Sequence, residues 1–319
     1  MIYKNLYIIG NGFDQHHNIP CSFQNFMAWI KENDASLVSR LDQAYNNAWD
    51  YNWWRDFENS LAKLNISYYA NMKGNLYDPE YIKDGSIEER TELASRKVIE
   101  DFDRIKDSLK RDFQKWLLEA YENCSIDKKI QLSGADNIFL TFNYTKLLED
   151  AYSIDARQVY HIHGVIDDKD SMIVGHGLGI VELNDIMASQ EPRMGEVWNK
   201  KLNLMTRFQF VTPSHKNLAI LSSLESIMSL KKDVLGCIEK NKRFFDEILD
   251  VQRIYVFGFS FSPIDMPYLE KIIRRTKPDT HWVISWYSQE DRWRVMDFAI
   301  KYNIQNITMI NGINTINIQ

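Results

Sequence analysis

The stretch Leu6-Tyr7-Ile8-Ile9-Gly10-Asn11-Gly12-Phe13-Asp14 joins a short apolar run directly to a pair of glycines. Because glycine has no side chain, Gly10 and Gly12 allow the backbone to turn sharply and bring its N–H groups against an anion. The stretch therefore predicts a strand followed by a phosphate-holding turn. A dinucleotide-binding fingerprint would have a third glycine where Gln15 stands, and an acidic residue at the end of a second strand. Asp34 has roughly the spacing of that acid but ends a helical pattern, so the sequence disfavours an ordinary nicotinamide dehydrogenase.

The composition is that of a folded protein for which neither a membrane nor nucleic acid is the expected partner. Of the 319 residues, 45% are hydrophobic and 13% aromatic, which is enough apolar material for a large core. No apolar run approaches the ~20 residues of a membrane helix, and the net charge of -6 argues against nucleic acid as the primary ligand. Cys21, Cys124 and Cys237 are widely spaced, which excludes a four-cysteine zinc ribbon and fits a reducing compartment. We therefore expect a cytoplasmic protein.

Strand-like apolar runs recur along the chain with helical stretches between them. They lie at Ile2–Ile9, Asn137–Phe142, Gln158–Ile162, Arg253–Phe259, His281–Trp286 and Ile304–Ile310. Two other stretches, about 45–130 and about 182–250, carry mainly helical patterns and are predicted to be large helical insertions. Strands that alternate with helical crossovers predict an α/β fold with a Rossmann-like, doubly wound and mostly parallel sheet. We expect a single elaborated domain over residues 1–319.

Short polar residues mark the expected starts of several helices. Ser22 and Thr145 each precede a helical pattern and can cap it with a side-chain oxygen. Ser262 and Pro263 are predicted to open another helix, because proline suits the first helical position. Ser288 is predicted to open the last helix of the chain.

Polar residues and glycines gather where the predicted strands end. They form the segments Gly10–Asp14, Thr141–Thr145, His161–Gly164 and Gly258–Ser260. In a doubly wound sheet the ligand lies beyond the carboxyl ends of the strands. The four segments are therefore expected to face one crevice.

These segments also resemble a known family. The pieces Gly-Asn-Gly-Phe-Asp, Asn18-Ile19-Pro20, Thr-Phe-Asn-Tyr-Thr with Glu149, His-Ile-His-Gly, and Gly-Phe-Ser with Asp265 are similar to those of the AbiH abortive-infection proteins. That family in turn resembles the sirtuin-like domains that consume NAD, which have their glycine turn, asparagine segment, His-Gly and Gly-Thr-Ser in the same order. The resemblance implies a role in bacterial defence against phage, with NAD as the substrate.

The resemblance also implies roles for individual residues. Gly10 and Gly12 would contact the pyrophosphate of NAD, and Gly258 and Ser260 would contact its adenosine side. Further residues expected at the NAD site are Asn11, Phe13, Asp14, Thr141 and Tyr144, and the rings of Phe13, Phe23 and Tyr144 are candidates to enclose the nicotinamide. Asn143 would hold the nicotinamide ribose or a water beneath it, and His163 would be the general base.

The chain departs from the sirtuin-like pattern at four positions. Asp14 stands where sirtuins usually have a small hydroxyl residue, and Thr145 replaces the aspartate that follows the asparagine. Asn18 replaces a turn glycine, and Phe259 replaces a threonine. The chain also has no Cys-x-x-Cys pair for the zinc module of protein deacylases. Hydrolysis of NAD is therefore expected in preference to deacylation.

The expected chemistry is that of a metal-free NAD glycohydrolase. Cleavage of the nicotinamide–ribose bond passes through an oxocarbenium-like transition state, which needs a preorganised pocket and a poised nucleophile. A histidine can accept a proton near neutral pH, and an asparagine amide can both donate and accept. Because unrestrained loss of NAD would kill the host, the activity is expected to be gated. A homo-oligomer or a separately encoded activator would provide the gate, with the helical regions as the assembly surfaces.

Three other interpretations fit parts of the sequence. His161 and His163 alternate onto one strand face and could bind a metal together with His176 or His17. The same glycine turn could belong to a noncatalytic nucleotide sensor or scaffold of a defence complex. A flavin or nicotinamide oxidoreductase is the third interpretation, and the missing third glycine counts against it.

Overall fold

In the computed structural model, the chain forms two compact units. The structure describes residues 2–65, 87–126, 128–132, 136–178, 222–223 and 225–313. The first unit comprises Met1–Asn25, Phe113–Ile173 and Asp233–Gln319, and the second comprises Phe26–Asp112 and Val174–Lys232. Parts of both expected helical insertions, including 66–86 and 179–221, lie outside the described residues, so their boundaries stay predictions.

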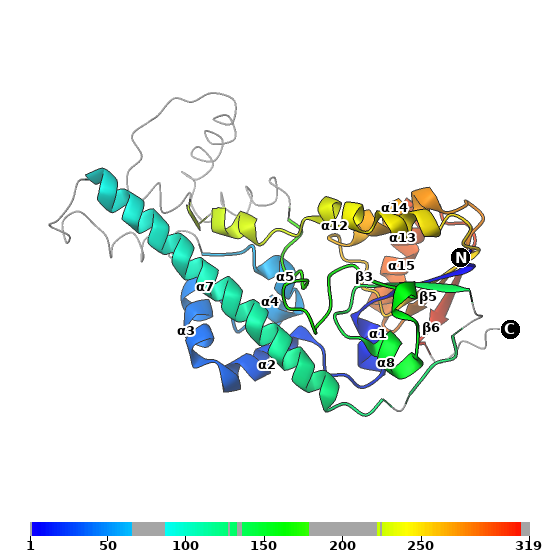
Figure 1. Ribbon diagram of the computed structural model, residues 1–319, viewed down its shortest axis with the longest axis horizontal. Coiled ribbons are helices and arrows are strands. Elements are labelled where there is room, and N and C mark those ends of the chain that lie inside the picture. The colour runs from blue at the N-terminus through cyan, green and yellow to red at the C-terminus, as the bar shows by residue number, and fades with distance from the viewer. Residues whose placement is uncertain are drawn as a thin grey trace, which may run out of the picture. The chain divides into compact units, whose positions relative to one another are not determined.

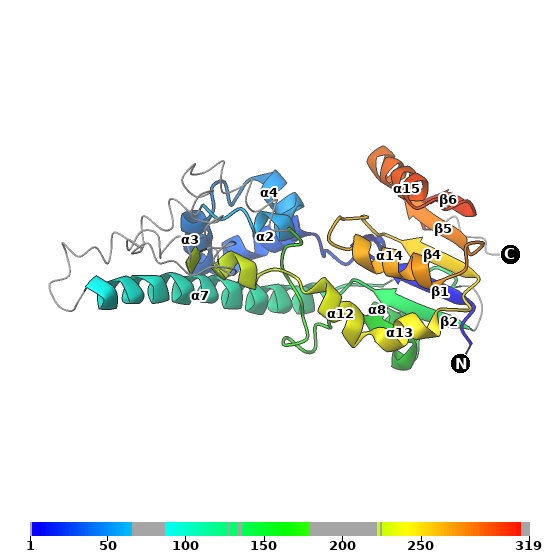
Figure 2. The same ribbon diagram turned by 90° about the horizontal axis from the view of Figure 1, so that it is seen from above.

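The first unit contains a six-stranded, fully parallel sheet, which confirms the expected α/β, Rossmann-like fold. Its strands are β1 (Asn5–Ile9), β2 (Asn137–Thr141), β3 (Val159–His161), β4 (Arg253–Phe257), β5 (His281–Trp286) and β6 (Ile307–Asn311). They pair in the order β3-β2-β1-β4-β5-β6. Figure 2 shows the strands β2, β1, β4, β5 and β6 side by side. The chain builds outward from β1 to β3 on one side and then from β4 to β6 on the other. The reversal places the ligand-binding crevice of such a fold beside β1 and β4.

The two faces of the sheet are built from alternating side chains. On one face, Leu6 and Ile8 belong to a buried hydrophobic core that also includes residues of α14. On the other face, the ring of Tyr7 stacks on those of its register neighbours Phe139 and Tyr255, at centroid distances of 5.0 and 4.7 Å. Because both faces are covered, the strands read as continuous apolar runs in the sequence.

Short helices connect the strands of the first unit. They are α1 (Asn11–His16), α8 (Leu147–Tyr152), the 3-10 turn η1 (Ala156–Gln158), α12 (Val234–Lys240), α13 (Lys242–Glu247), α14 (Met266–Arg275) and α15 (Gln289–Lys301). Ser288 opens α15 as predicted, in a capping box with Asp291. The predicted start at Ser262 and Pro263 is wrong: those residues belong to the loop before α14, whose cap position is Asp265.

The helices of the second unit bury a cluster of aromatic side chains. Its elements are α3 (Ala35–Ala44), α4 (Tyr51–Arg55) and α5 (Phe57–Ser60), together with most of α2 (Phe23–Asn33) and α7 (Ile87–Glu122), the long helix of Figure 1. Ser22 accepts a hydrogen bond from the Asn25 amide and caps α2 as predicted. The Trp54 ring stacks on Phe57 and meets the edge of Phe26, and all three side chains are buried.

Among the described residues, no helix is both long enough and apolar enough to cross a bilayer.

Candidate active site

The glycine turn after β1 packs directly against the end of β4. The amides of Gly10 and Gly12 donate to the carbonyls of Phe257 and Gly258, each at 2.9 Å. A Cβ on Gly10 would lie 2.5 Å from the Gly258 oxygen, and one on Gly258, whose φ is +60°, would lie 2.2 Å from the Phe13 nitrogen. Glycine is required at these positions because two backbones touch. The amides of Gly10 and Gly12 are therefore engaged by the protein itself, and no bound phosphate is needed to explain these two glycines.

Asp14, Asn143 and Thr145 form a buried polar cluster beside this turn. Asn143 Nδ2 donates to Asp14 Oδ1 at 2.6 Å and to the Gly10 carbonyl at 3.0 Å. Thr145 Oγ1 donates to Asp14 Oδ2 at 2.6 Å. The backbone N–H of Asn143 donates to Thr141 Oγ1 at 3.1 Å. Residues from the ends of β1 and β2, more than 120 positions apart in the chain, thus meet at one point.

Burial changes the acidity of Asp14. Desolvation raises the pKa of this carboxyl from 3.8 to about 6, against the opposing effects of the hydrogen bonds from Thr145 and Asn143 and of the nearby His161. The two hydrogen bonds account for both oxygens, but they do not replace the hydration that an exposed carboxylate would have. A carboxyl with a raised pKa in a strand-end cluster is a common sign of a functional site.

The expected cap at Thr145 is wrong. The residue at the cap position of α8 is Lys146, and no side chain caps that helix. The Thr145 hydroxyl is directed to the carboxylate of Asp14 instead. Asp14 and Thr145 are two of the departures from the sirtuin-like pattern. They are therefore linked to each other by a hydrogen bond.

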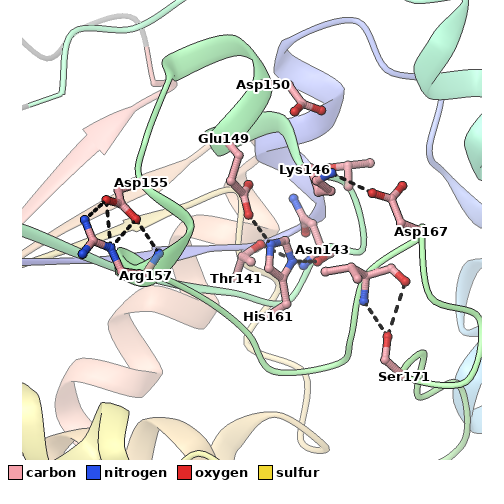
Figure 3. A network of polar contacts seen from close by, with 12 residues as sticks. Thr141, Asn143, Lys146, Glu149, Asp150, Asp155, Arg157, His161, Asp167 and Ser171 are labelled. Carbon is pink, nitrogen blue, oxygen red and sulfur yellow. Dashed lines mark hydrogen bonds and ion pairs between the residues drawn. The ribbon is translucent and has the colours of Figure 1, made fainter.

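Sequence reasoning gave no defined role to a second pair, Glu149 and His161. His161 ends β3, and its Nε2 lies 2.8 Å from Glu149 Oε1 at the first turn of α8. Its Nδ1 lies 3.3 Å from the carbonyl oxygen of Asn143 (Figure 3). Both ring nitrogens therefore lie within hydrogen-bond distance of an oxygen atom. His161 could be found from the sequence because it stands at the end of a predicted strand, whereas Glu149 lies within the helix that follows the neighbouring strand.

His163 lies in an aromatic pocket two residues beyond the last residue of β3. Its side chain is 4% exposed, and its Nε2 is 3.8 Å from Asp265 Oδ1. The rings of Phe142, Tyr268 and Tyr144 surround it at centroid distances of 5.4, 5.9 and 6.4 Å. Asp265 occupies the cap position of α14 but makes no side-chain capping bond to that helix. Its carboxylate is placed to interact with His163 instead.

The other predicted site residues have more ordinary surroundings. Phe13 is fully buried and packs against His17, and the hydroxyl of Tyr144 donates to the Ile173 carbonyl at 2.8 Å. Asn11 donates through Nδ2 to the Cys21 carbonyl, and Ser260 is exposed. Phe23 packs against Phe113, and Asn18 adopts a φ of 64°, a left-handed conformation that glycine and asparagine adopt more readily than other residues.

The histidines considered for a metal site have other contacts. His17 uses Nδ1 toward the Phe13 carbonyl and Nε2 toward the Tyr152 hydroxyl, both at 2.7 Å. His176 belongs to the second unit, where its Nε2 lies 3.0 Å from the Ile227 carbonyl oxygen. Within the described ranges, no group of three or more His, Cys, Asp and Glu side chains is placed to hold a metal ion.

Sheet order and strand-end chemistry together define a Rossmann-like α/β protein with a polar site at the carboxyl ends of its central strands. Residues 6–286 match the family model described as "Bacteriophage abortive infection AbiH". The chain belongs to this AbiH family, and the membership indicates a role in abortive-infection defence against phage. No curated protein and no solved structure matches the chain.

Proposed function

We propose that the protein is an NAD glycohydrolase, which cleaves NAD to nicotinamide and ADP-ribose during abortive infection. The main support is the placement of Asn143 and His163, the two residues to which the sirtuin-like resemblance gives the chemistry. Both side chains are buried, and they follow the carboxyl ends of the neighbouring strands β2 and β3. Ligands of doubly wound sheets bind at this edge.

The reaction requires little covalent chemistry from the protein. The bond between the ribose C1′ and the nicotinamide nitrogen breaks, and nicotinamide leaves with the bonding electron pair. The oxygen of a water molecule then bonds to C1′, and a proton of that water passes to a base. ADP-ribose, nicotinamide and one proton are the products. Stabilisation of the oxocarbenium-like ribose and correct placement of the water are the main requirements.

His163 is the proposed base in this scheme. Histidine is the side chain that most often accepts protons in enzymes near neutral pH. The aromatic rings around it restrict water, and Asp265, 3.8 Å away, can stabilise the protonated ring. Asn143 contributes an amide held by Asp14 and Gly10, and so can orient a ribose hydroxyl or the attacking water.

We propose further that the activity is gated by self-assembly or by a separately encoded activator. The cell must tolerate the protein before infection, and an NAD-consuming enzyme with constant activity would prevent this. Light scattering of the purified protein measures the first possibility: a single monomeric species with and without NAD would contradict the homo-oligomer.

The test of the activity is chromatographic measurement of nicotinamide release from NAD. Wild type is compared with His163→Ala and with a matched control, His281→Ala, whose histidine lies at the amino end of β5. Release by wild type and His281→Ala, but not by His163→Ala, would support the proposal. Release by all three proteins would refute His163 as the base. Binding of NAD without release by any of the three proteins would exclude an enzyme that is active on its own, and would fit either an enzyme that awaits its activator or the noncatalytic nucleotide sensor.

A further inference from the structure

The orientation of the Asn143 amide follows from its partners. The two hydrogens of Nδ2 point to the Gly10 carbonyl oxygen and to Asp14 Oδ1, at 3.0 and 2.6 Å. Carbonyl and carboxylate oxygens only accept, so the nitrogen must face them and the amide cannot be reversed. Both donors of the side chain are thereby used, and among the described residues no donor to Asn143 Oδ1 is observed.

The groups that hold Asn143 are themselves held from behind. Asp14 Oδ2 accepts from Thr145 Oγ1 at 2.6 Å, which fixes the plane of the carboxylate. The amide of Gly10 donates to the Phe257 carbonyl, which fixes the turn that carries the second acceptor. Asp14, Asn143 and Thr145 are all less than 10% exposed. The Asn143 side chain is therefore positioned by two buried partners from one turn.

We propose that Asp14 is a positioning residue, which fixes Asn143 so that Oδ1 is the atom presented to the ligand. Asn143 then offers an acceptor only, and the ligand group that it binds must be an O–H donor. This inference rests on the proposed function for the identity of that donor, which is either a hydroxyl of the nicotinamide ribose or the attacking water. The geometry of the clamp itself does not depend on the proposed function.

Two substitutions of Asp14 separate positioning from proton transfer. In Asp14→Asn the new Oδ1 can accept from Asn143, and the new Nδ2 can donate to Thr145, whose hydroxyl can also accept. The clamp survives, but the side chain cannot take a proton. In Asp14→Ala the clamp is lost. Asp297→Ala, which removes an exposed carboxylate from α15, is the control for the loss of an acid.

The first arm of the experiment measures kcat for nicotinamide release and the Kd for NAD by calorimetry. Positioning predicts that kcat and Kd of Asp14→Asn stay within about threefold of the wild-type values. In Asp14→Ala, one of these two quantities should worsen about 100-fold, as expected for a misplaced reacting group. A higher Kd for NAD in Asp14→Ala would identify the donor as the ribose hydroxyl. A lower kcat with an unchanged Kd would identify it as the water. Equal losses in both variants, or no loss in either, would overturn the proposal.

The second arm works without any NAD chemistry. The side-chain amide protons of Asn143 are observed by NMR and assigned from their absence in Asn143→Asp. Both protons are expected to exchange slowly with solvent in wild type and in Asp14→Asn, and at least one to exchange rapidly in Asp14→Ala. Unchanged protection in Asp14→Ala would overturn the positioning role. If wild type neither binds nor cleaves NAD, the proposed function fails, and this arm still decides the role of Asp14.

Discussion

Replacing Asp14 by asparagine is expected to make the folded protein more stable at neutral pH. The carboxyl is buried, and its pKa is raised from 3.8 to about 6, chiefly by desolvation. A pKa that is higher in the folded state than in the unfolded state means that the folded state binds the proton more tightly. The contribution of Asp14 to stability is therefore most favourable below pH 3.8 and falls as the pH rises through 6.

The size of the effect follows from the two pKa values. A difference from 3.8 to about 6 corresponds to a cost of about 3 kcal/mol for the ionised group at neutral pH. The asparagine introduced at this position has no charge to desolvate and can keep the hydrogen bonds to Asn143 and Thr145. The free energy of unfolding of Asp14→Asn, relative to that of wild type, should therefore increase by up to about 3 kcal/mol between pH 4 and pH 7.5.

Urea unfolding at the two pH values provides the measurement. The free energies of unfolding of wild type and Asp14→Asn are subtracted at each pH, so that titrations common to both proteins cancel. We expect the difference to be small at pH 4 and to favour the variant at pH 7.5. A difference that does not change with pH, or a variant that is less stable at pH 7.5, would refute the reasoning.

Three other substitutions test separate features. Gly258→Ala is expected to lower the free energy of unfolding by about 3 kcal/mol or more, because its Cβ would lie 2.2 Å from the Phe13 nitrogen. In the control Gly312→Ala, φ is similar at +70° and the new Cβ would meet only the Tyr287 ring, at 4.0 Å, so that the backbone cost of about 1 to 2 kcal/mol remains. Equal losses in the two variants would contradict the clash. Ser288→Ala removes the capping box of α15 and should cost about 1 kcal/mol in the same assay, whereas no change would show that the cap does not matter. Asp265→Asn should lower kcat for nicotinamide release about tenfold with little effect on KM, and an unchanged kcat would remove Asp265 from the proposed chemistry.

The central strands of the sheet could be predicted because they are buried on both faces. Such strands read as short apolar runs between turn residues, and β5 begins and ends at the predicted residues His281 and Trp286. The first strand starts at Asn5, three residues later than predicted, since apolar residues before it do not pair in the sheet. The cap of α15 was predictable because Ser288 and its partner lie within one turn of the chain.

The contacts within the candidate site depend on distant parts of the chain. In the local sequence, Thr145 is well placed to cap α8. Its hydroxyl instead donates to the buried carboxylate of Asp14, 131 residues earlier, because a buried carboxylate without hydrogen-bond donors is costly. Gly258 was expected at the adenosine side of NAD, and its positive φ and its contact with the first turn could not be inferred from one strand alone. Sequence spacing therefore identified which residues gather at the edge, but not which of them are partners.

The contact between the glycine turn and β4 also bears on how fast a ligand could associate. To move away from the sheet, the turn would have to break the two hydrogen bonds from Gly10 and Gly12 and separate two backbones that touch. A ligand at this edge thus meets a surface whose shape exists before it arrives, and little ordering entropy is lost on binding. Encounter at this part of the site would then be limited by diffusion and access, and not by the closing of a loop.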